Sequence, residues 1–172
     1  GYTKPNNHEV DMVFSFHHLK VDYKNKEKWT SMPFDFEELK SLLHTWQVEM
    51  QKGNGWNALF WNCHDQPRSV SRFGDDKNYR KESAKMLAAT IHLMKGTPYI
   101  YQGEEIGMTN HYFTDIKQYR DVESINAYHI LKDKGVKEEQ IHQILQEKSR
   151  DNSRTPMQWD STESYNQIKT IK

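Results

Sequence analysis

The chain has 172 residues, enough for one domain with a core, and its 24 basic and 24 acidic residues cancel. This balance argues against a nucleic-acid partner or an acidic interaction tail. The mean hydropathy is -1.01, and no apolar run approaches the roughly 18–20 residues that span a bilayer, so no membrane partner is expected. The single cysteine, Cys63, excludes an internal disulfide framework. With the polar start of the chain, these features predict a soluble, cytoplasmic protein.

The first predicted element is a strand, Met12–Phe16, an apolar run that ends in the polar residues HHLK. A basic loop follows, and then Asp35 with Glu38 three residues later indicates the start of a helix. The apolar residues of this helix recur at helical spacing and define one face: Leu39, Leu42, Leu43, Trp46 and Met50. Gly53 and Gly55 are expected to end it.

A second strand is predicted at Asn57–Trp61, shortly before the pair His64-Asp65. The next helix is expected at Lys81–Lys95, with one apolar face made by Ala84, Leu87, Ala88, Ile91 and Met94. The sequence Gly-Thr-Pro stops this helix, and a third strand is predicted at Pro98–Tyr101, running into QGEE. Strands that alternate with helices predict an α/β fold with parallel strands and helical crossovers.

After Thr109 the alternation of predicted strands and helices stops. Two polar helices are predicted on either side of Gly135, at Asp121–Lys134 and Val136–Lys148, and the loop RDNSRTPMQWD follows. All three predicted strands end in polar residues that could do chemistry. Because the reaction centre of a (β/α)8 barrel lies at the carboxyl ends of its strands, this coincidence predicts a barrel segment.

Several long motifs occur in one order along the chain: HDQPRSVSRFGDD, ESAKML, KGTPYIYQGEEIGMTN and RDNSRTPMQWD. Together they resemble the α-amylase superfamily, specifically its bacterial oligosaccharide α-glucosidase branch, from Met12 to Asp160. Within that branch, FHHLKVDY followed by NKEKW is most similar to the trehalose-6-phosphate hydrolase subfamily. The resemblance implies that residues 1–160 form the C-terminal portion, about strands six to eight, of a (β/α)8 catalytic barrel, followed by a divergent tail at 161–172.

The resemblance gives His64 and Asp65 a role in the sugar site. It implies that they hold the glucosyl unit and stabilise its transition state, whose oxocarbenium-like ring carries positive charge that a carboxylate can stabilise. A polar strand end with only local hydrogen bonds is the alternative. Retaining glycosidases also need an aspartate nucleophile and a glutamic acid/base about 5 Å apart. The family's contexts for these two are missing here and would precede Gly1, so this chain is expected to be inactive without the N-terminal half of the barrel.

A basic cluster after the first strand points to an anionic ligand. Lys20 is the predicted contact for the 6-phosphate of a sugar phosphate, with Lys28 as a second contact, because lysine binds phosphate as a point charge. A solvated charged loop is the alternative interpretation. His18 is expected to line the sugar site. A metal site with His17 is not expected, because adjacent strand residues point to opposite faces and zinc needs three or four convergent ligands.

Two arginines follow the second strand. Arg68 and Arg72 are candidates to contact a sugar hydroxyl or to orient Asp65, and surface pairing with Asp75 and Asp76 is the alternative. Near the end of the chain, two more arginines either border the pocket entrance or pair at the surface: Arg150 and Arg154.

Other reactive side chains are expected to have structural roles. Glu104 and Glu105 are adjacent and diverge, and the resemblance implies a pocket-flanking role for their motif. Cys63 is expected to pack rather than to act as a nucleophile. The family needs no organic cofactor, and no clustered Asp/Asn loop of the kind that holds calcium is visible.

The resulting hypothesis is a fragment of an α-glucosidase that hydrolyses trehalose 6-phosphate to glucose and glucose 6-phosphate with retention. The first alternative is an oligo-1,6-glucosidase, or a related glucosidase or glucosyltransferase, that acts on unphosphorylated sugars. An alternative of another class is a non-catalytic barrel kept for binding, which would usually have lost the His64-Asp65 pair.

Overall fold

The computed structural model describes residues 2–159. A three-stranded parallel sheet in the order β1-β2-β3 lies at its centre, formed by β1 (Val13–Phe14), β2 (Asn57–Leu59) and β3 (Thr97–Pro98). Val13 pairs with Asn57, and Ala58 pairs with Thr97. The sequence-based prediction of parallel strands joined by helical crossovers is confirmed.

The third strand starts one residue earlier than predicted. Its ladder covers Thr97–Pro98 and not Pro98–Tyr101. The reason lies in Gly96, whose φ of +155° is strained for other residues, and where a Cβ would lie only 2.6 Å from the carbonyl oxygen of Asn57. This glycine brings the chain close to β2, so pairing begins immediately after it, and the backbone N–H of Tyr99 donates to Leu59 at 2.7 Å.

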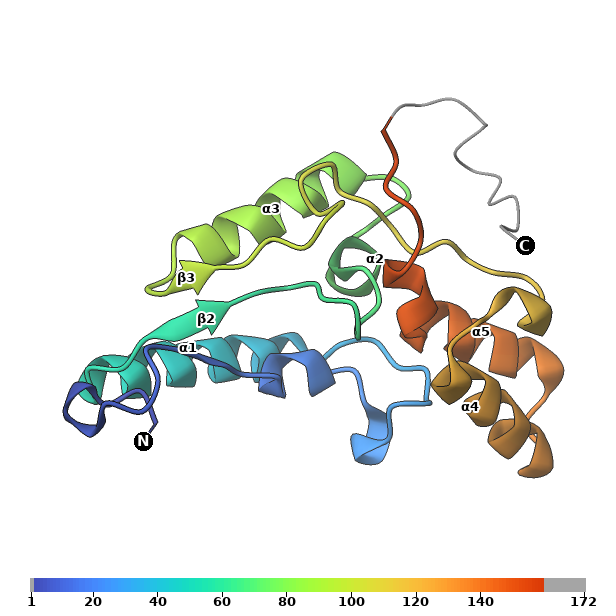
Figure 1. Ribbon diagram of the computed structural model, residues 1–172. Helices are drawn as coiled ribbons and strands as arrows, with labels where there is room; N and C mark the ends of the chain where they lie inside the picture. Colours follow the sequence, from blue (N-terminus) through green and yellow to red (C-terminus); the bar gives the residue numbers. More distant parts are fainter. Residues whose placement is uncertain (1, 160–172) are drawn as a thin grey trace.

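Two helices flank the sheet, α1 (Phe36–Lys52) and α3 (Arg80–His92), as Figure 1 shows. Asp35 caps α1 as predicted, because its carboxylate accepts a 2.8 Å hydrogen bond from the backbone N–H of Glu38. The helix α3 ends at His92 rather than at the predicted Lys95. A five-residue helix, α2 (Ser69–Phe73), was not predicted, since it is too short to display a helical period.

The predicted helices of the second half of the chain are present as α4 (Val122–Asp133) and α5 (Glu138–Lys148). They lie side by side at the end of the molecule away from the strands (Figure 1). Short 3-10 helices connect the main elements at Pro5–Asn7, His17–Lys20, Lys24–Lys26, Ile116–Gln118 and Arg150–Ser153.

The buried apolar residues form two separate clusters. The first, which we call the sheet core, packs α1, α2 and α3 against the strand ends: Leu19, Val21, Leu39, Phe60, Trp61, Val70, Phe73, Leu87 and Ile91. The second, which we call the hairpin core, lies within and beside α4 and α5: Phe113, Tyr119, Ala127, Tyr128, Leu131, Ile141, Ile144 and Leu145. Neither core contains a membrane-spanning element, because no helix within residues 2–159 is long and apolar enough to cross a bilayer.

Candidate functional site

A cavity of about 320 Å³ opens at the carboxyl ends of the three strands. Segments that follow all three strands line it, and it contains both His64 and Asp65. Its wall is aromatic: the ring of Phe14 lies 5.3 Å from that of Phe60 and 4.8 Å from that of Tyr99. An aromatic surface beside an open carboxylate suits a sugar ring, which offers apolar faces and hydroxyl groups.

His64 and Asp65 stand at the edge of this cavity with accessible side chains. The side chain of His64 is 70% exposed and that of Asp65 is 43% exposed. The His64 Nε2 lies 3.2 Å from the Asp65 Oδ2. Both groups are therefore open to a ligand from the cavity, as a sugar-binding role requires.

Two arginines from the loop after α5 hold Asp65 in place. The Oδ1 of Asp65 accepts hydrogen bonds from Arg150 Nη1 and Arg154 Nη2, each at 2.9 Å. Arg154 also donates from Nε to the backbone carbonyl of His64 at 2.8 Å. The sequence was compatible with two roles for these arginines, at the pocket entrance or in surface pairs. The structure places both on the carboxylate at the cavity. The other oxygen of Asp65 faces His64.

Arg150 also binds a buried aspartate, Asp121. Asp121 accepts two hydrogen bonds of 2.8 Å from Arg150, at Nε and Nη2, and its side chain is 4% exposed. Burial raises the pKa of the Asp121 carboxyl, but the hydrogen bonds and charges of Arg150 and Arg154 outweigh this effect and keep that pKa below its ordinary value. Asp121 therefore stays ionised and fixes the guanidinium group that contacts Asp65.

Arg72 does not pair with Asp75 or Asp76, so that alternative is wrong. Its guanidinium group binds Asp22 through Nε at 2.9 Å and Nη2 at 2.6 Å, and the two side chains are only 3% and 5% exposed. Asp75 instead caps the local turn that follows α2. Because a long-range partner 50 residues away satisfies Arg72, no local sequence pattern could have indicated this pair.

Arg68 is buried, at 1% exposure, and does not line the cavity. It donates to the backbone carbonyl of Gln102 at 2.7 Å and to that of Ser153 at 3.3 Å. Its predicted contact with a sugar stays a prediction. The geometry favours a positioning role, because the side chain ties the segments after β3 and α5 to the loop after β2.

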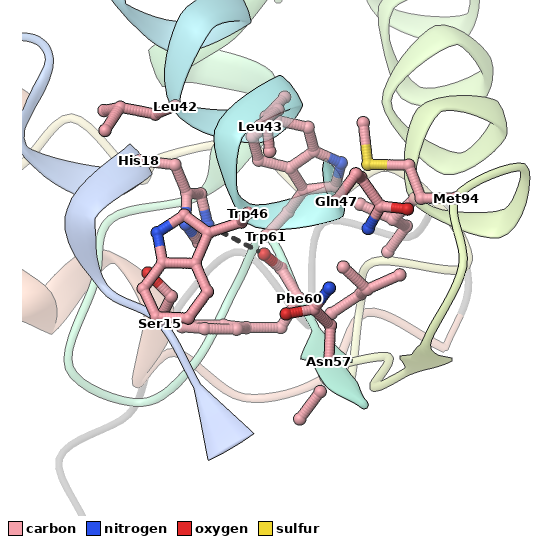
Figure 2. Close-up of a pocket in the computed structure, with 13 residues that line it drawn as sticks. Ser15, His18, Leu42, Leu43, Trp46, Gln47, Asn57, Phe60, Trp61 and Met94 are labelled. Atoms are coloured by element: carbon pink, nitrogen blue, oxygen red, sulfur yellow. Dashed lines mark hydrogen bonds between the residues drawn. The ribbon is translucent and has the colours of Figure 1, made fainter. Parts of the chain in front are cut away.

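His18 lies in a different cavity, between β2 and α1, which Figure 2 shows. Its Nε2 is 3.0 Å from the carbonyl oxygen of Phe60 and must donate to it, and its ring packs edge-on against those of Phe60 and Trp61. Burial lowers the pKa of His18 to about 4, so the ring is neutral at physiological pH. A role in lining the sugar site stays a prediction, and this placement favours a packed histidine. His17, its neighbour, is exposed.

The two candidate phosphate contacts have different surroundings. Lys20 is exposed, and within residues 2–159 its ammonium group has no hydrogen-bond or ion-pair partner. Lys28 forms a two-pronged ion pair with Glu123 on α4, with both N–O distances at 2.8 Å. A phosphate group can therefore bind Lys20 directly, whereas binding to Lys28 requires it to compete with Glu123.

The remaining reactive groups have structural surroundings. Glu104 accepts a 3.3 Å hydrogen bond from the Tyr101 backbone, and burial raises the pKa of its carboxyl group. Cys63 packs against the sheet core, and burial raises the pKa of its thiol, which disfavours the nucleophilic thiolate. Among residues 2–159, no group of three or more potential ligands is arranged to hold a metal ion.

Parallel strands with helical crossovers, and an open carboxylate at their carboxyl ends, are the features of a β/α-barrel enzyme. The comparison with known families agrees. The family model for the α-amylase catalytic domain matches residues 1–169. The chain belongs to the α-amylase family.

Curated relatives narrow the similarity within the family. The chain is 67% identical over 163 residues to trehalose-6-phosphate hydrolase of Bacillus subtilis, a match that covers 95% of this chain and 29% of that protein. It is 53% identical over 161 residues to an oligo-1,6-glucosidase of Halalkalibacterium halodurans, covering 94% of this chain and 28% of that protein. The chain thus spans less than a third of the length of these relatives.

A solved structure agrees with the sequence relatives. The crystal structure of trehalose-6-phosphate hydrolase from Bacillus licheniformis matches with a TM-score of 0.91 and 64% identity, covering 96% of this chain and 30% of that chain. The arrangement of the strands and helices described above is therefore that of a segment of an α-amylase-family barrel.

Proposed function

We propose that this chain supplies about strands six to eight of a (β/α)8 barrel that hydrolyses trehalose 6-phosphate to glucose and glucose 6-phosphate with retention of configuration. The observation that carries the proposal is Asp65, an open carboxylate held by two arginines at the strand ends. The higher identity to trehalose-6-phosphate hydrolase, 67% against 53% for the oligo-1,6-glucosidase, supports the substrate.

Asp65 and His64 act on the glucosyl unit in this proposal. In an α-glucosidase the bond to the anomeric carbon breaks with growing positive charge on the ring, and a fixed carboxylate stabilises that charge. Arg150 and Arg154 bind one oxygen of Asp65 and hold the carboxylate in a fixed orientation. His64, 70% exposed beside it, is placed to donate a hydrogen bond to a sugar hydroxyl.

Lys20 supplies the first contact for the 6-phosphate. It stands on the turn after β1, it is exposed, and no described side chain competes for its ammonium group. Lys28 is the second contact, and Glu123 must then share it with the phosphate group. A phosphomonoester carries close to two negative charges, so two lysines match it.

The nucleophile and the acid/base belong to the upstream part of the barrel in this proposal. Asp121 is buried and fully paired with arginines, and Glu104 is engaged by the local backbone. The partner of this chain is therefore the N-terminal part of the barrel, and its ligand is a sugar phosphate. A cytoplasmic location stays a prediction.

A glucosidase that acts on unphosphorylated sugars is the second candidate, favoured by the 53% identity to an oligo-1,6-glucosidase. The two candidates differ at Lys20. If the natural substrate carries a phosphate group, loss of the Lys20 ammonium group weakens the binding of phosphorylated substrates only. If the natural substrate is unphosphorylated, the loss affects the binding of all substrates equally or of none.

The test uses a chimaera in which the matched 163-residue segment of the Bacillus subtilis relative is replaced by that of this chain. We expect hydrolysis of trehalose 6-phosphate with a KM below that for isomaltose. Lys20→Ala should raise the KM for trehalose 6-phosphate roughly tenfold, the loss expected for one charge-assisted contact, and leave p-nitrophenyl α-glucoside unaffected. Asp65→Asn should abolish turnover of both substrates. A folded chimaera without activity, or equal effects of Lys20→Ala on both substrates, would contradict the proposal.

A further inference from the structure

The turn that carries Lys20 is held by a buried cluster of charges that the sequence did not reveal. Asp22 lies two residues after Lys20, and its side chain is 5% exposed. It binds Arg72 from α2 and Lys148, the last residue of α5, whose side chain is 3% exposed. The Lys148 Nζ lies 2.6 Å from Asp22 Oδ2 and 3.0 Å from the backbone carbonyl oxygen of Asp22. We call Asp22, Arg72 and Lys148 the buried triad.

The buried triad fixes the backbone on both sides of Lys20. Arg72 donates to the carbonyl oxygen of Leu19, and Lys148 donates to that of Asp22. Val21 is 1% exposed, and its carbonyl oxygen accepts a 2.8 Å hydrogen bond from the Asp35 backbone. Lys20 alone in this turn is left with an exposed side chain and no partner among residues 2–159.

The electrostatics of the triad are unusual, because two cations share one carboxylate. Burial raises the pKa of the Asp22 carboxyl, but the hydrogen bonds and charges of Arg72 and Lys148 outweigh this and keep that pKa below its ordinary value. Burial lowers the pKa of Lys148, and the charge of Asp22 opposes this only in part. A carboxylate with Arg72 alone would already be paired bidentately. Lys148 is thus a second cation on a carboxylate that Arg72 already pairs, and it adds a hydrogen bond to the backbone carbonyl of Asp22.

We propose that Lys148 is a positioning residue for phosphate specificity, which acts through Asp22 to hold the turn that presents Lys20 to the 6-phosphate of the substrate. This inference rests on the proposed function, because it assigns Lys20 to the phosphate group. It links α5, which contributes no lining residue to the strand-end cavity, to the choice between phosphorylated and unphosphorylated substrates.

The variant that tests the inference is Lys148→Met in the chimaera, because it leaves Asp22 paired with Arg72. We expect the KM for trehalose 6-phosphate to rise roughly threefold to tenfold with little change in kcat, and the KM for p-nitrophenyl α-glucoside to stay within about twofold. Lys148→Arg keeps the positive charge and should restore most of the loss. Lys132→Met is the matched control on the same helical hairpin, since Lys132 is 57% exposed.

A double-mutant cycle separates positioning from a general loss of structure. If Lys148 acts through Lys20, then Lys148→Met should have almost no further effect on the KM in a Lys20→Ala background. A merely structural role would give additive losses and would weaken both substrates. Where Lys148→Met does not fold, Lys148→Gln, which keeps one donor for the Asp22 carbonyl, decides by the same ratio of KM values.

The outcomes distinguish this inference from the proposed function. If Lys20→Ala does not change the preference for phosphorylated substrate, the proposed function fails and the inference fails with it. If Lys20→Ala removes the preference but Lys148→Met keeps it, only the positioning inference is overturned. If both variants remove the preference for phosphorylated substrate and their effects are not additive, the proposed function and the positioning inference are both supported.

Discussion

The sheet region and the helical hairpin of α4 and α5 differ in how completely they bury their apolar side chains. In the hairpin core, Ile141 and Leu145 are 0% exposed, and the two helices cover one another. At the strands, Phe14 is 46% exposed and Tyr99 is 44% exposed, although both belong to the aromatic wall of the strand-end cavity. The hairpin is closed around its own core, whereas the sheet leaves one apolar face exposed and, among residues 2–159, no further strand pairs with either of its edges.

The two regions therefore have different requirements for stability. Unpaired sheet edges and an exposed aromatic face are unfavourable in water. In a complete barrel, further strands pair with the edges and cover the face. The two regions have separate apolar cores, and ion pairs are among the contacts that connect them. Lys148 and Arg150, at and just after the end of α5, reach Asp22 and Asp65 in the strand-end loops. The hairpin therefore contacts both Asp65 and the turn that carries Lys20.

Breaking the buried triad should give the largest loss of stability. We expect Arg72→Met to lower the free energy of unfolding by about 3–5 kcal/mol, because it removes one partner of a buried charged cluster and leaves the Leu19 carbonyl unsatisfied. Urea denaturation followed by tryptophan fluorescence measures this loss. Arg80→Met, at an exposed position, is the matched control and should change stability by less than about 0.5 kcal/mol. Equal effects of the two changes would contradict a stabilising role of the buried triad.

Truncating one side chain in each region sharpens the contrast. Leu145→Ala in the hairpin core should cost about 2–5 kcal/mol, because it leaves a cavity among fully buried neighbours. Phe14→Ala on the open face should cost less than about 1 kcal/mol in this chain, since much of its ring is already exposed to water. In the completed chimaera we expect the cost of Phe14→Ala to rise. Similar costs in both contexts would show that the face is not covered.

The buried His18 makes the sheet region sensitive to acid. Its folded-state pKa of about 4 lies below the ordinary value of 6.5. Between these two pH values His18 is therefore protonated in the unfolded chain and neutral in the folded chain. Stability is full above pH 6.5 and should fall by about 1.4 kcal/mol per pH unit as the pH drops towards 4. Denaturation midpoints between pH 7 and pH 5 measure this, with His18→Gln flattening the dependence.

The smallest expected effect is at the start of α1. Asp35→Ala removes the hydrogen bond to the Glu38 backbone and should cost about 1 kcal/mol. Asp35→Asn keeps an acceptor and should recover most of the loss in the same urea titration. A loss in Asp35→Asn as large as that in Asp35→Ala would indicate that the charge, rather than the cap, carries the effect.

Local patterns in the sequence predicted the architecture well. Alternating strands and helices, the Asp35 cap and the two helices around Gly135 all follow from short-range periodicity and capping, and the structure confirms them. The edges of elements were less predictable. The start of β3 depends on how closely Gly96 approaches Asn57, which is a contact across 39 residues, and no local pattern encodes it.

The candidate site was predictable only in part. The motif around His64 and Asp65 indicated a pair at the end of a strand, and the cavity contains both. The partners of Arg72 and Lys148 could not be read from the sequence, because Asp22 lies 50 and 126 residues away from them. Arg68 and His18 are polar residues beside predicted strands, yet packing against backbone carbonyls rather than solvent exposure decides where they point.

The most direct test of this account is an assay of glucose 6-phosphate release from trehalose 6-phosphate, with circular dichroism to verify folding. The purified 172-residue chain and the chimaera completed by the Bacillus subtilis relative should be compared side by side. We expect release by the chimaera and none by the folded chain alone, because in the proposed mechanism Asp65 only stabilises the transition state, and the nucleophile and the acid/base are supplied by the upstream part of the barrel. Turnover by the chain alone would contradict this account and would require a nucleophile and an acid/base among its own carboxylates.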